Sequence, residues 1–264
     1  KSCVRPDNIS LPIIRIAEFI FLLIFFIVRY KLYMNFENEL ISGVLIKRYK
    51  RFFVDIKVKN QIITAHCPNT GSMMGLLTKG NKVWISKSNN PKRKLKYTIQ
   101  IIEKNKRKIG INTHITNKIV REGLENKIIN GFNDFVKIEP EKKYGNNTRF
   151  DFLIIKKTSK IFLEVKNVTL CRKNNLAEFP DSVTDRGAKH IKELLKAIKE
   201  GYKGYILFVV QREDCKYFSI ASDIDPIYSK LLTDGVKKKL KIICYDCKFS
   251  TKGIKLNKEL KIQI

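Results

Sequence analysis

The chain has 264 residues, 44% of them hydrophobic, so it can bury a sizeable core and is not a disordered protein. Its 53 Lys and Arg against 25 Asp and Glu give a net charge of +28, which favours a polyanionic partner: nucleic acid first, an anionic membrane surface second. The six cysteines are scattered, without the even spacing of a secreted disulfide framework, so we expect a reducing, cytoplasmic setting.

The first 33 residues contain a strongly apolar run, IIRIAEFIFLLIFFIV at residues 13–28. Its uninterrupted part, residues 19–28, is shorter than the roughly 20 apolar residues that a bilayer span needs. It also lacks the small-residue cleavage site of a signal peptide. We interpret residues 1–33 as a hydrophobic extension outside the native mature sequence, with a membrane anchor as the alternative. From Met34 onward the chain still has 48 basic and 23 acidic residues, a net charge of +25.

Residues 34–112 contain short strand-like segments separated by Gly, Asn and Pro turns. About five such strands predict a small β-barrel. Basic residues alternate with aromatic residues in this region, an arrangement that can hold backbone phosphates and stack the bases of DNA. The alternative is the solvated face of a lysine-rich protein. The candidate DNA-binding residues of this region are Arg48, Arg51, Lys92, Arg93 and Lys94.

The loop HCPNTGSM, residues 66–73, lies within the predicted barrel and is dense in turn formers. Its backbone N–H groups from residue 69 to residue 72 can face an anion. His66 and Cys67 are adjacent, and adjacent residues of a strand point to opposite faces, so they cannot share a metal ion. We expect a buried, structural histidine and cysteine here.

Residues 113–264 alternate between helical and strand-like patterns. The helices are recognised by apolar residues at helical spacing, and the strands by the apolar composition of buried strands. The order helix, three strands, helix, strand, helix, strand predicts an α/β sandwich with a mixed sheet. The segments, in this order, are 116–129, 132–139, 150–155, 161–165, 184–200, 205–212, 223–232 and 239–249.

The hairpin of residues 148–170 carries the strongest candidate site. Its two strands are apolar, yet Asp151 lies near the start of one and Glu164 near the end of the other. In an antiparallel pair these carboxylates become neighbours, and Lys166 shares the face of Glu164 because strand side chains alternate. Buried charges of this kind are costly unless a cation or a partner binds them. Glu122, at the edge of the preceding helix, either reaches this site or meets solvent.

The helix at 184–200 begins with three basic side chains, Arg186, Lys189 and His190, and a helix N-terminus with basic residues suits a phosphate. The alternative for Arg186 is an ion pair with a neighbouring aspartate. Cys244 and Cys247 form a CxxC pair, but zinc needs two further ligands and no second pair exists. We expect core thiols at these two positions.

The order Asp151, then Glu164-Val165-Lys166, resembles the D…(D/E)xK signature of restriction-endonuclease-like nucleases. More specific are five strings in a fixed order: HCPNTGSM, NPKRKLKYT, TRFDFLII, FLEVKNVTL and FPDSVTDRGAKH. Together they resemble the sugar fermentation stimulation protein family (SfsA) over essentially all of residues 34–264. The resemblance implies an OB-fold-like β-barrel at 34–112 and a restriction-endonuclease-like (PD-(D/E)XK) α/β domain with a mixed sheet at 113–264.

The resemblance also implies non-specific DNA binding and a regulatory role in sugar (maltose) metabolism. We therefore expect a DNA-binding protein, with Mg²⁺-dependent DNA hydrolysis as the alternative. In that alternative Asp151 and Glu164 hold Mg²⁺, and Lys166 orients the attacking water and stabilises the developing charge. If the site is not catalytic, Lys166 neutralises a carboxylate in a structural pair.

Overall fold

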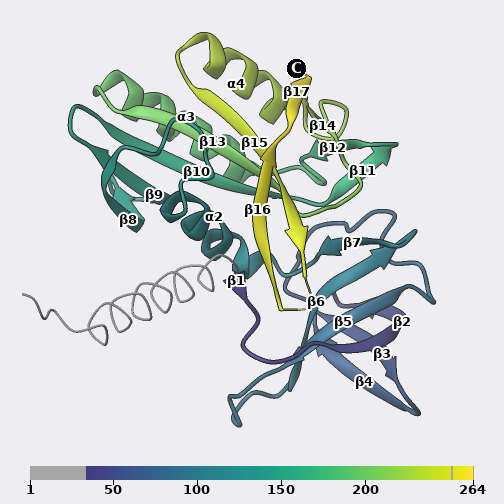
Figure 1. Cartoon of the computed structure of the whole chain (residues 1–264). Coiled ribbons are helices and arrows are strands. Elements are labelled where there is room, and N and C mark those ends of the chain that lie inside the picture. Colours follow the sequence, from purple (N-terminus) through teal and green to yellow (C-terminus); the bar gives the residue numbers. More distant parts are fainter. Residues whose placement is uncertain (1–33, 251, 264) are drawn as a thin grey trace, which may run out of the picture.

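The computed structural model describes residues 34–250 and 252–263. The predicted extension at 1–33, and with it the membrane-anchor alternative, lies outside these residues. None of the helices in the described part of the chain is long and apolar enough to cross a membrane. Figure 1 shows a β-barrel beneath a larger α/β domain, with the C-terminus on the larger domain.

The smaller body is a barrel of short antiparallel strands whose order in the sheet is β4-β3-β2-β5-β6-β7. A pairing between His66 of β4 and Thr98 of β6 closes the ring, so a barrel predicted from the turn pattern is confirmed. Alternate side chains fill its interior, among them Leu45, Val54 and Ile85. The strands are β2 (Ile41–Tyr49), β3 (Phe53–Val58), β4 (Gln61–His66), β5 (Lys82–Lys87), β6 (Tyr97–Lys104) and β7 (Arg107–Gly110).

The larger domain is built on a mixed seven-stranded sheet in the order β1-β16-β15-β13-β10-β9-β8, as predicted. Strands β10, β13 and β15 pair in parallel at its centre, and antiparallel strands lie at both edges. The central strands are apolar on both sides because helices cover both faces. The strands are β1 (Met34–Asn35), β8 (Phe135–Tyr144), β9 (Thr148–Lys156), β10 (Lys160–Val168), β13 (Lys203–Val210), β15 (Lys241–Phe249) and β16 (Gly253–Glu259).

Three helices cover the sheet. The short helix η1 (Thr113–Ile115) leads into α2 (Thr116–Glu125), which packs on one face, while α3 (Asp185–Lys199) and α4 (Pro226–Lys237) pack on the other (Figure 1). The side chain of Thr184 accepts a hydrogen bond from Gly187 N at 3.0 Å and so fixes where α3 begins. This cap matters for function because α3 points its first turns at the candidate site.

The sequence patterns miss a second, four-stranded sheet in the order β11-β12-β14-β17. The sequence patterns predict no strand between residues 165 and 184, and they make 239–249 the last strand. Both expectations are wrong, because β16 and β17 follow β15 and two strands lie before α3. These strands are short and mix charged with apolar residues, so they show little period: β11 (Leu170–Lys173), β12 (Leu176–Phe179), β14 (Tyr217–Ile220) and β17 (Lys261–Gln263).

The two bodies are joined by backbone contacts at the end of β7. Gly110 N donates to Gln211 O at 2.9 Å, and Lys108 N donates to a carboxylate oxygen of Glu213 at 2.9 Å. The strand at Met34–Asn35, which begins the predicted barrel region, pairs with β16 of the larger sheet. The barrel therefore sits directly against the domain that carries the carboxylates.

Candidate active site

The candidate site lies where the backbone pairing of β9 and β10 ends. The last backbone pair is Leu163 with Phe152, and the next positions along the two strands are Glu164 and Asp151. There the carboxylate of Asp151, through Oδ2, accepts a hydrogen bond from Val165 N at 2.7 Å. The Asp151 side chain thus accepts from a backbone amide just beyond the last β9–β10 pair. This hydrogen bond holds the Asp151 carboxylate against β10, the strand that carries Glu164.

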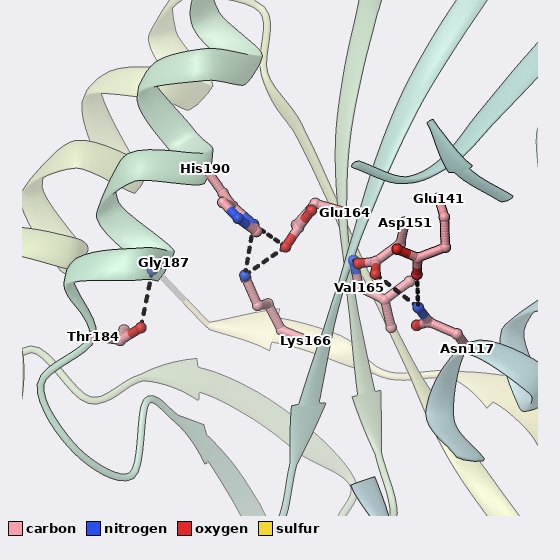
Figure 2. A network of polar contacts seen from close by, with 9 residues as sticks. All are labelled: Asn117, Glu141, Asp151, Glu164, Val165, Lys166, Thr184, Gly187 and His190. Atoms are coloured by element: carbon pink, nitrogen blue, oxygen red, sulfur yellow. Dashed lines mark hydrogen bonds and ion pairs between the residues drawn. The ribbon is translucent and has the colours of Figure 1, made fainter. Parts of the chain in front are cut away.

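The other oxygen of Asp151 is held from α2. Asn117 Nδ2 donates to Asp151 Oδ1 at 2.7 Å and lies 3.5 Å from an oxygen of Glu141 (Figure 2). Burial, and then the charge of Glu164, raise the pKa of Asp151 to about 6, against the lowering effect of its two hydrogen bonds. Asp151 is therefore a carboxylate whose charge a nearby cation would stabilise.

Glu164 is buried and faces α3. Lys166 Nζ donates to its Oε1 at 2.8 Å, and Nδ1 of His190 donates to the same oxygen (Figure 2). Its other oxygen, Oε2, is buried without a hydrogen-bond partner among the described residues. Burial acts to raise the pKa of Glu164, but the hydrogen bond from His190 and the charge of Lys166 outweigh it and hold the pKa below its ordinary value. Glu164 is thus an ionised carboxylate with one oxygen available.

Both carboxylates and Lys166 line one cleft of about 390 Å³. Its other walls come from the barrel loop at residues 69–71 and from the segment at 179–186 that leads into α3. The site is therefore enclosed by both domains, and the barrel supplies part of its wall.

The barrel loop reaches this cleft because of two residues. Arg48 donates to the carbonyl oxygens of Asn69 at 2.8 Å and Gly71 at 3.1 Å, which fixes the loop. A Cβ at Gly71 would collide with the carboxylate of Asp181. The two loops therefore approach closely here, and a larger residue at position 71 would require the Asp181 side chain to move.

A second cleft of about 380 Å³ lies on the α2 side of Asp151 and is rich in carboxylates. Glu122, Glu125 and Glu141 line it together with Asp151. Burial is the main cause that raises the pKa of Glu122 to about 7. Glu122 thus does reach the neighbourhood of Asp151, although the described residues give it no hydrogen bond to that side chain.

The donor set fits an oxygen-preferring divalent cation. No group of three or more His, Cys, Asp or Glu side chains within residues 34–250 and 252–263 is arranged to hold a metal ion. Two carboxylates nevertheless line one cleft, and the unpartnered Oε2 of Glu164 is an orphaned acceptor. Mg²⁺ commonly binds through one or two carboxylates, with waters and substrate phosphates completing its shell.

The predicted DNA-binding residues lie in different settings. Lys189 Nζ donates to Asn147 O at 3.0 Å while its side chain stays at the surface. Arg93 is half-buried, with one terminal nitrogen 3.2 Å from Nδ1 of His66. Four others are exposed to solvent: Arg51, Lys92, Lys94 and Arg186.

Two of these predicted residues have structural partners instead. Arg48 is engaged with the loop at 69–71, as described above. His190 was predicted, with Arg186 and Lys189, to bind a phosphate, and its ring is buried against Glu164. Its spacing from the buried Ile191 and Leu194 places it on the core-facing stripe of α3, a pattern that sequence reasoning could have used.

Other sequence expectations have mixed outcomes. Cys244 and Cys247 are buried core thiols, as expected, and burial raises the pKa of both. Cys67 is buried too, but His66 is only half-buried and borders a further cleft. Asn117, which holds Asp151, was not predicted, because one amide in the first turn of a helix gives no sequence signal.

A closed barrel joined to a mixed sheet, with two carboxylates and a lysine on adjacent strands, defines a class of protein. It is the class that combines an OB fold with a restriction-endonuclease-like domain. The family model of the SfsA N-terminal OB domain matches residues 46–111, and that of the sugar fermentation stimulation protein RE domain matches residues 114–253. The chain belongs to the sugar fermentation stimulation protein family.

Individual relatives agree with this family assignment. Sugar fermentation stimulation protein homologues from Pelagibacter ubique and Maricaulis maris are 51% and 39% identical to this chain, over 87% and 88% of its length and 99% of theirs. The structure of Pyrococcus furiosus SfsA in complex with Ca²⁺ superposes with a TM-score of 0.79 at 24% identity, covering 88% of this chain and 98% of that one. This structural likeness supports the fold.

Proposed function

We propose that this chain binds DNA along the side where the barrel meets the larger domain. The observation that carries the proposal is the position of Arg186, which is exposed and lines the same cleft as Asp151 and Lys166. Exposed basic residues of the barrel, Arg51 and Lys92 among them, add to a chain with a large positive charge. Such side chains bind phosphates and release counterions, so binding is sequence-independent and salt-dependent.

A salt series of duplex affinity tests this proposal. Wild type should lose affinity steeply as salt rises, and Arg186→Gln should flatten the log–log slope by about 0.9, the value for one lost phosphate contact. Lys203→Gln is the matched control, because it removes one exposed charge at the opposite end of the parallel strands, where Lys203 pairs with Ile161. A flat salt response of the wild type would overturn the proposal.

A second candidate function is hydrolysis of the phosphodiester bond, favoured by the paired carboxylates and the unpartnered Glu164 Oε2. Asp151 and Glu164 would hold a divalent cation, which supplies a polarised scissile phosphate and a more acidic attacking water. The Pyrococcus furiosus relative is described with Ca²⁺, which supports a divalent cation here. Mg²⁺ is the cation we expect, because phosphoryl chemistry commonly uses it.

The protein's own groups have separate parts in this chemistry. Lys166, held by Glu164, would orient the attacking water and stabilise negative charge that develops on the phosphate. Asn117 and the backbone N–H of Val165 keep the Asp151 carboxylate in one orientation. His190 does the same for Glu164 from the opposite side.

Plasmid nicking with Mg²⁺ or Mn²⁺ tests the catalytic candidate. Wild type should nick and lose activity when EDTA is added, Lys166→Ala should be inactive, and Lys160→Ala, at the exposed start of the same strand, should remain active. If neither wild type nor Lys160→Ala cuts, hydrolysis is excluded and the site is a binding remnant. A cytoplasmic location stays a prediction from the cysteine pattern. A regulatory role in sugar (maltose) metabolism stays a prediction of the family resemblance, and it would act through DNA binding.

A further inference from the structure

A third cleft, of about 230 Å³, lies between the barrel and the larger domain. His66 at the end of β4 and Arg93 in the loop before β6 reach it from the barrel. His114 of η1 and Lys118 of α2 reach it from the other side. Arg93 lies 3.2 Å from the Nδ1 atom of His66, and the rings of His66 and His114 are 6.2 Å apart. Two domains thus bring four basic side chains to one polar cleft.

These basic groups lack a neutralising partner. Among the described residues, Arg93, His114 and Lys118 make no ion pair with a carboxylate, and the acidic side chain that borders the cleft, Glu37, is exposed. Burial, and then the charges of Arg93 and His114, lower the pKa of His66. The lowered pKa keeps the His66 ring neutral near pH 7, so its Nδ1 can accept a hydrogen bond from Arg93. A bound anion would pair with the charges of Arg93 and Lys118, which no carboxylate among the described residues neutralises.

The rest of the lining suits the oxygens of a phosphate. Hydroxyl and amide side chains form much of the remaining wall. Gln100 Nε2 donates to Ser86 Oγ and Asn112 Nδ2 to Gln100 Oε1, and each amide has a second N–H that can donate to an oxygen without adding charge. The hydroxyl and amide residues of the wall are Ser86, Ser88, Thr98, Gln100 and Asn112.

An exposed aromatic ring lies beside His66, one of the residues that line this cleft. Phe52, in the turn between β2 and β3, is 45% exposed, and its ring is stacked on that of His66 at 6.5 Å with an interplanar angle of 12°. Two other aromatic residues of this part of the barrel, Tyr49 and Phe53, stack on each other at 5.5 Å. The outer face of Phe52 is the ring surface that this part of the barrel offers to a base.

We propose that this cleft, with Phe52, is a subsite for single-stranded nucleic acid. A backbone phosphate lies among Arg93, His114 and Lys118, and the adjoining base stacks on Phe52. A single strand fits better than a duplex because a base must leave its stack to reach an aromatic side chain. The inference rests on the proposed nucleic-acid binding and names its substrate class.

The subsite is placed to serve the candidate active site. Lys118 lines both this cleft and the acidic cleft beside Asp151, and the next residue back along α2, Asn117, holds the Asp151 carboxylate. A strand held at Phe52 and Arg93 therefore continues along the first turn of α2 toward Asp151.

Fluorescence anisotropy with a short labelled oligothymidylate, and with a duplex as second probe, tests the proposal. Phe52→Ala should weaken oligothymidylate binding by about five- to a hundredfold, as expected for loss of one stacked base, and leave duplex affinity unchanged. Its matched control is Ile62→Ala, which removes another exposed apolar side chain from the barrel. Arg93→Gln should flatten the salt slope for the single strand by about 0.7, one phosphate contact.

The control for Arg93→Gln is Arg107→Gln, the same charge change at the exposed start of β7. Lys118→Gln, on the larger domain, is a second charge variant should the barrel variant fold poorly. Single-strand affinities of Phe52→Ala and the charge variants equal to their controls would overturn the subsite while leaving duplex binding intact. A wild type that binds neither probe would overturn the proposed function as well, and displacement by inorganic phosphate alone at low concentration would indicate a free-anion site.

Discussion

At the scale of single residues, His190 shows how a buried side chain supports the site. Its ring donates to Glu164 Oε1, and removing that donor leaves a buried carboxylate oxygen with Lys166 as its remaining partner. We expect His190→Leu to lower the free energy of unfolding by about 1.5–3 kcal/mol, the usual contribution of a hydrogen bond to a charged group. His190→Gln, which retains an N–H donor, should recover part of the loss. Urea unfolding measures both, and equal midpoints for wild type and His190→Leu would contradict this role.

Glu122 gives the chain a predicted pH dependence. Its pKa is raised from 4.5 to about 7, chiefly by burial, so between these values the folded protein holds a proton that the unfolded chain has released. Stability must then fall as pH rises through this window, because the native state binds more protons than the unfolded state. Glu122→Gln should lose less stability than wild type in melting experiments between about pH 5 and about pH 7. Glu39→Gln, an exposed change, serves as control and should follow the wild type.

At the scale of elements, the start of α3 decides where His190 and Arg186 lie. Thr184 caps the helix, and its own backbone N–H donates to Asp225, the residue that caps α4. We expect Thr184→Ala to destabilise the fold by about 1 kcal/mol, and Thr184→Ser to restore it, since a serine hydroxyl also caps. Chemical denaturation tests this, with Thr158→Ala in an exposed turn as the control. A serine variant as unstable as the alanine variant would show that packing of the methyl group, and not the cap, is responsible.

Elements with a strong period were predictable from the sequence. The helix expected at 184–200 is α3 at Asp185–Lys199, and the expected hairpin strands are β9 and β10, because core-facing side chains recur at the period of each element. The small second sheet was not predictable, since its short strands, such as Leu170–Lys173, pair with partners remote in sequence. Strand alternation likewise places Lys166 beside Glu164, but the Asn117 contact depends on how α2 packs, which no local pattern encodes.

At the scale of the whole molecule, the cleft that holds Asp151 and Glu164 and the proposed single-strand subsite both depend on the position of the barrel against the larger domain. Gln211 is fully buried at this junction: its Nε2 donates to Thr116 Oγ1 at 3.1 Å and Asn167 Oδ1 at 2.5 Å, while its carbonyl accepts from Gly110 N. One residue therefore ties the barrel's last strand, through its backbone carbonyl, to α2 and β10, through its side chain. The positions of the 69–71 loop and of Arg93 relative to the larger domain follow from this contact.

Because Gly110 lies so close to Gln211, a double-mutant cycle can test whether this contact fixes the position of the barrel against the larger domain. A Cβ at position 110 would collide with the Gln211 side chain, which its hydrogen bonds hold in place. We expect Gly110→Ala to cost about 1–3 kcal/mol in the free energy of unfolding. In a Gln211→Ala background, where the obstructing atoms are absent, the same change should cost clearly less. Additive effects would mean that the collision is relieved elsewhere and that Gln211 does not fix the barrel. If coupling is observed, Gly110→Ala should also weaken oligothymidylate binding. The reason is that the barrel side and the larger-domain side of the proposed subsite would no longer keep their relative positions.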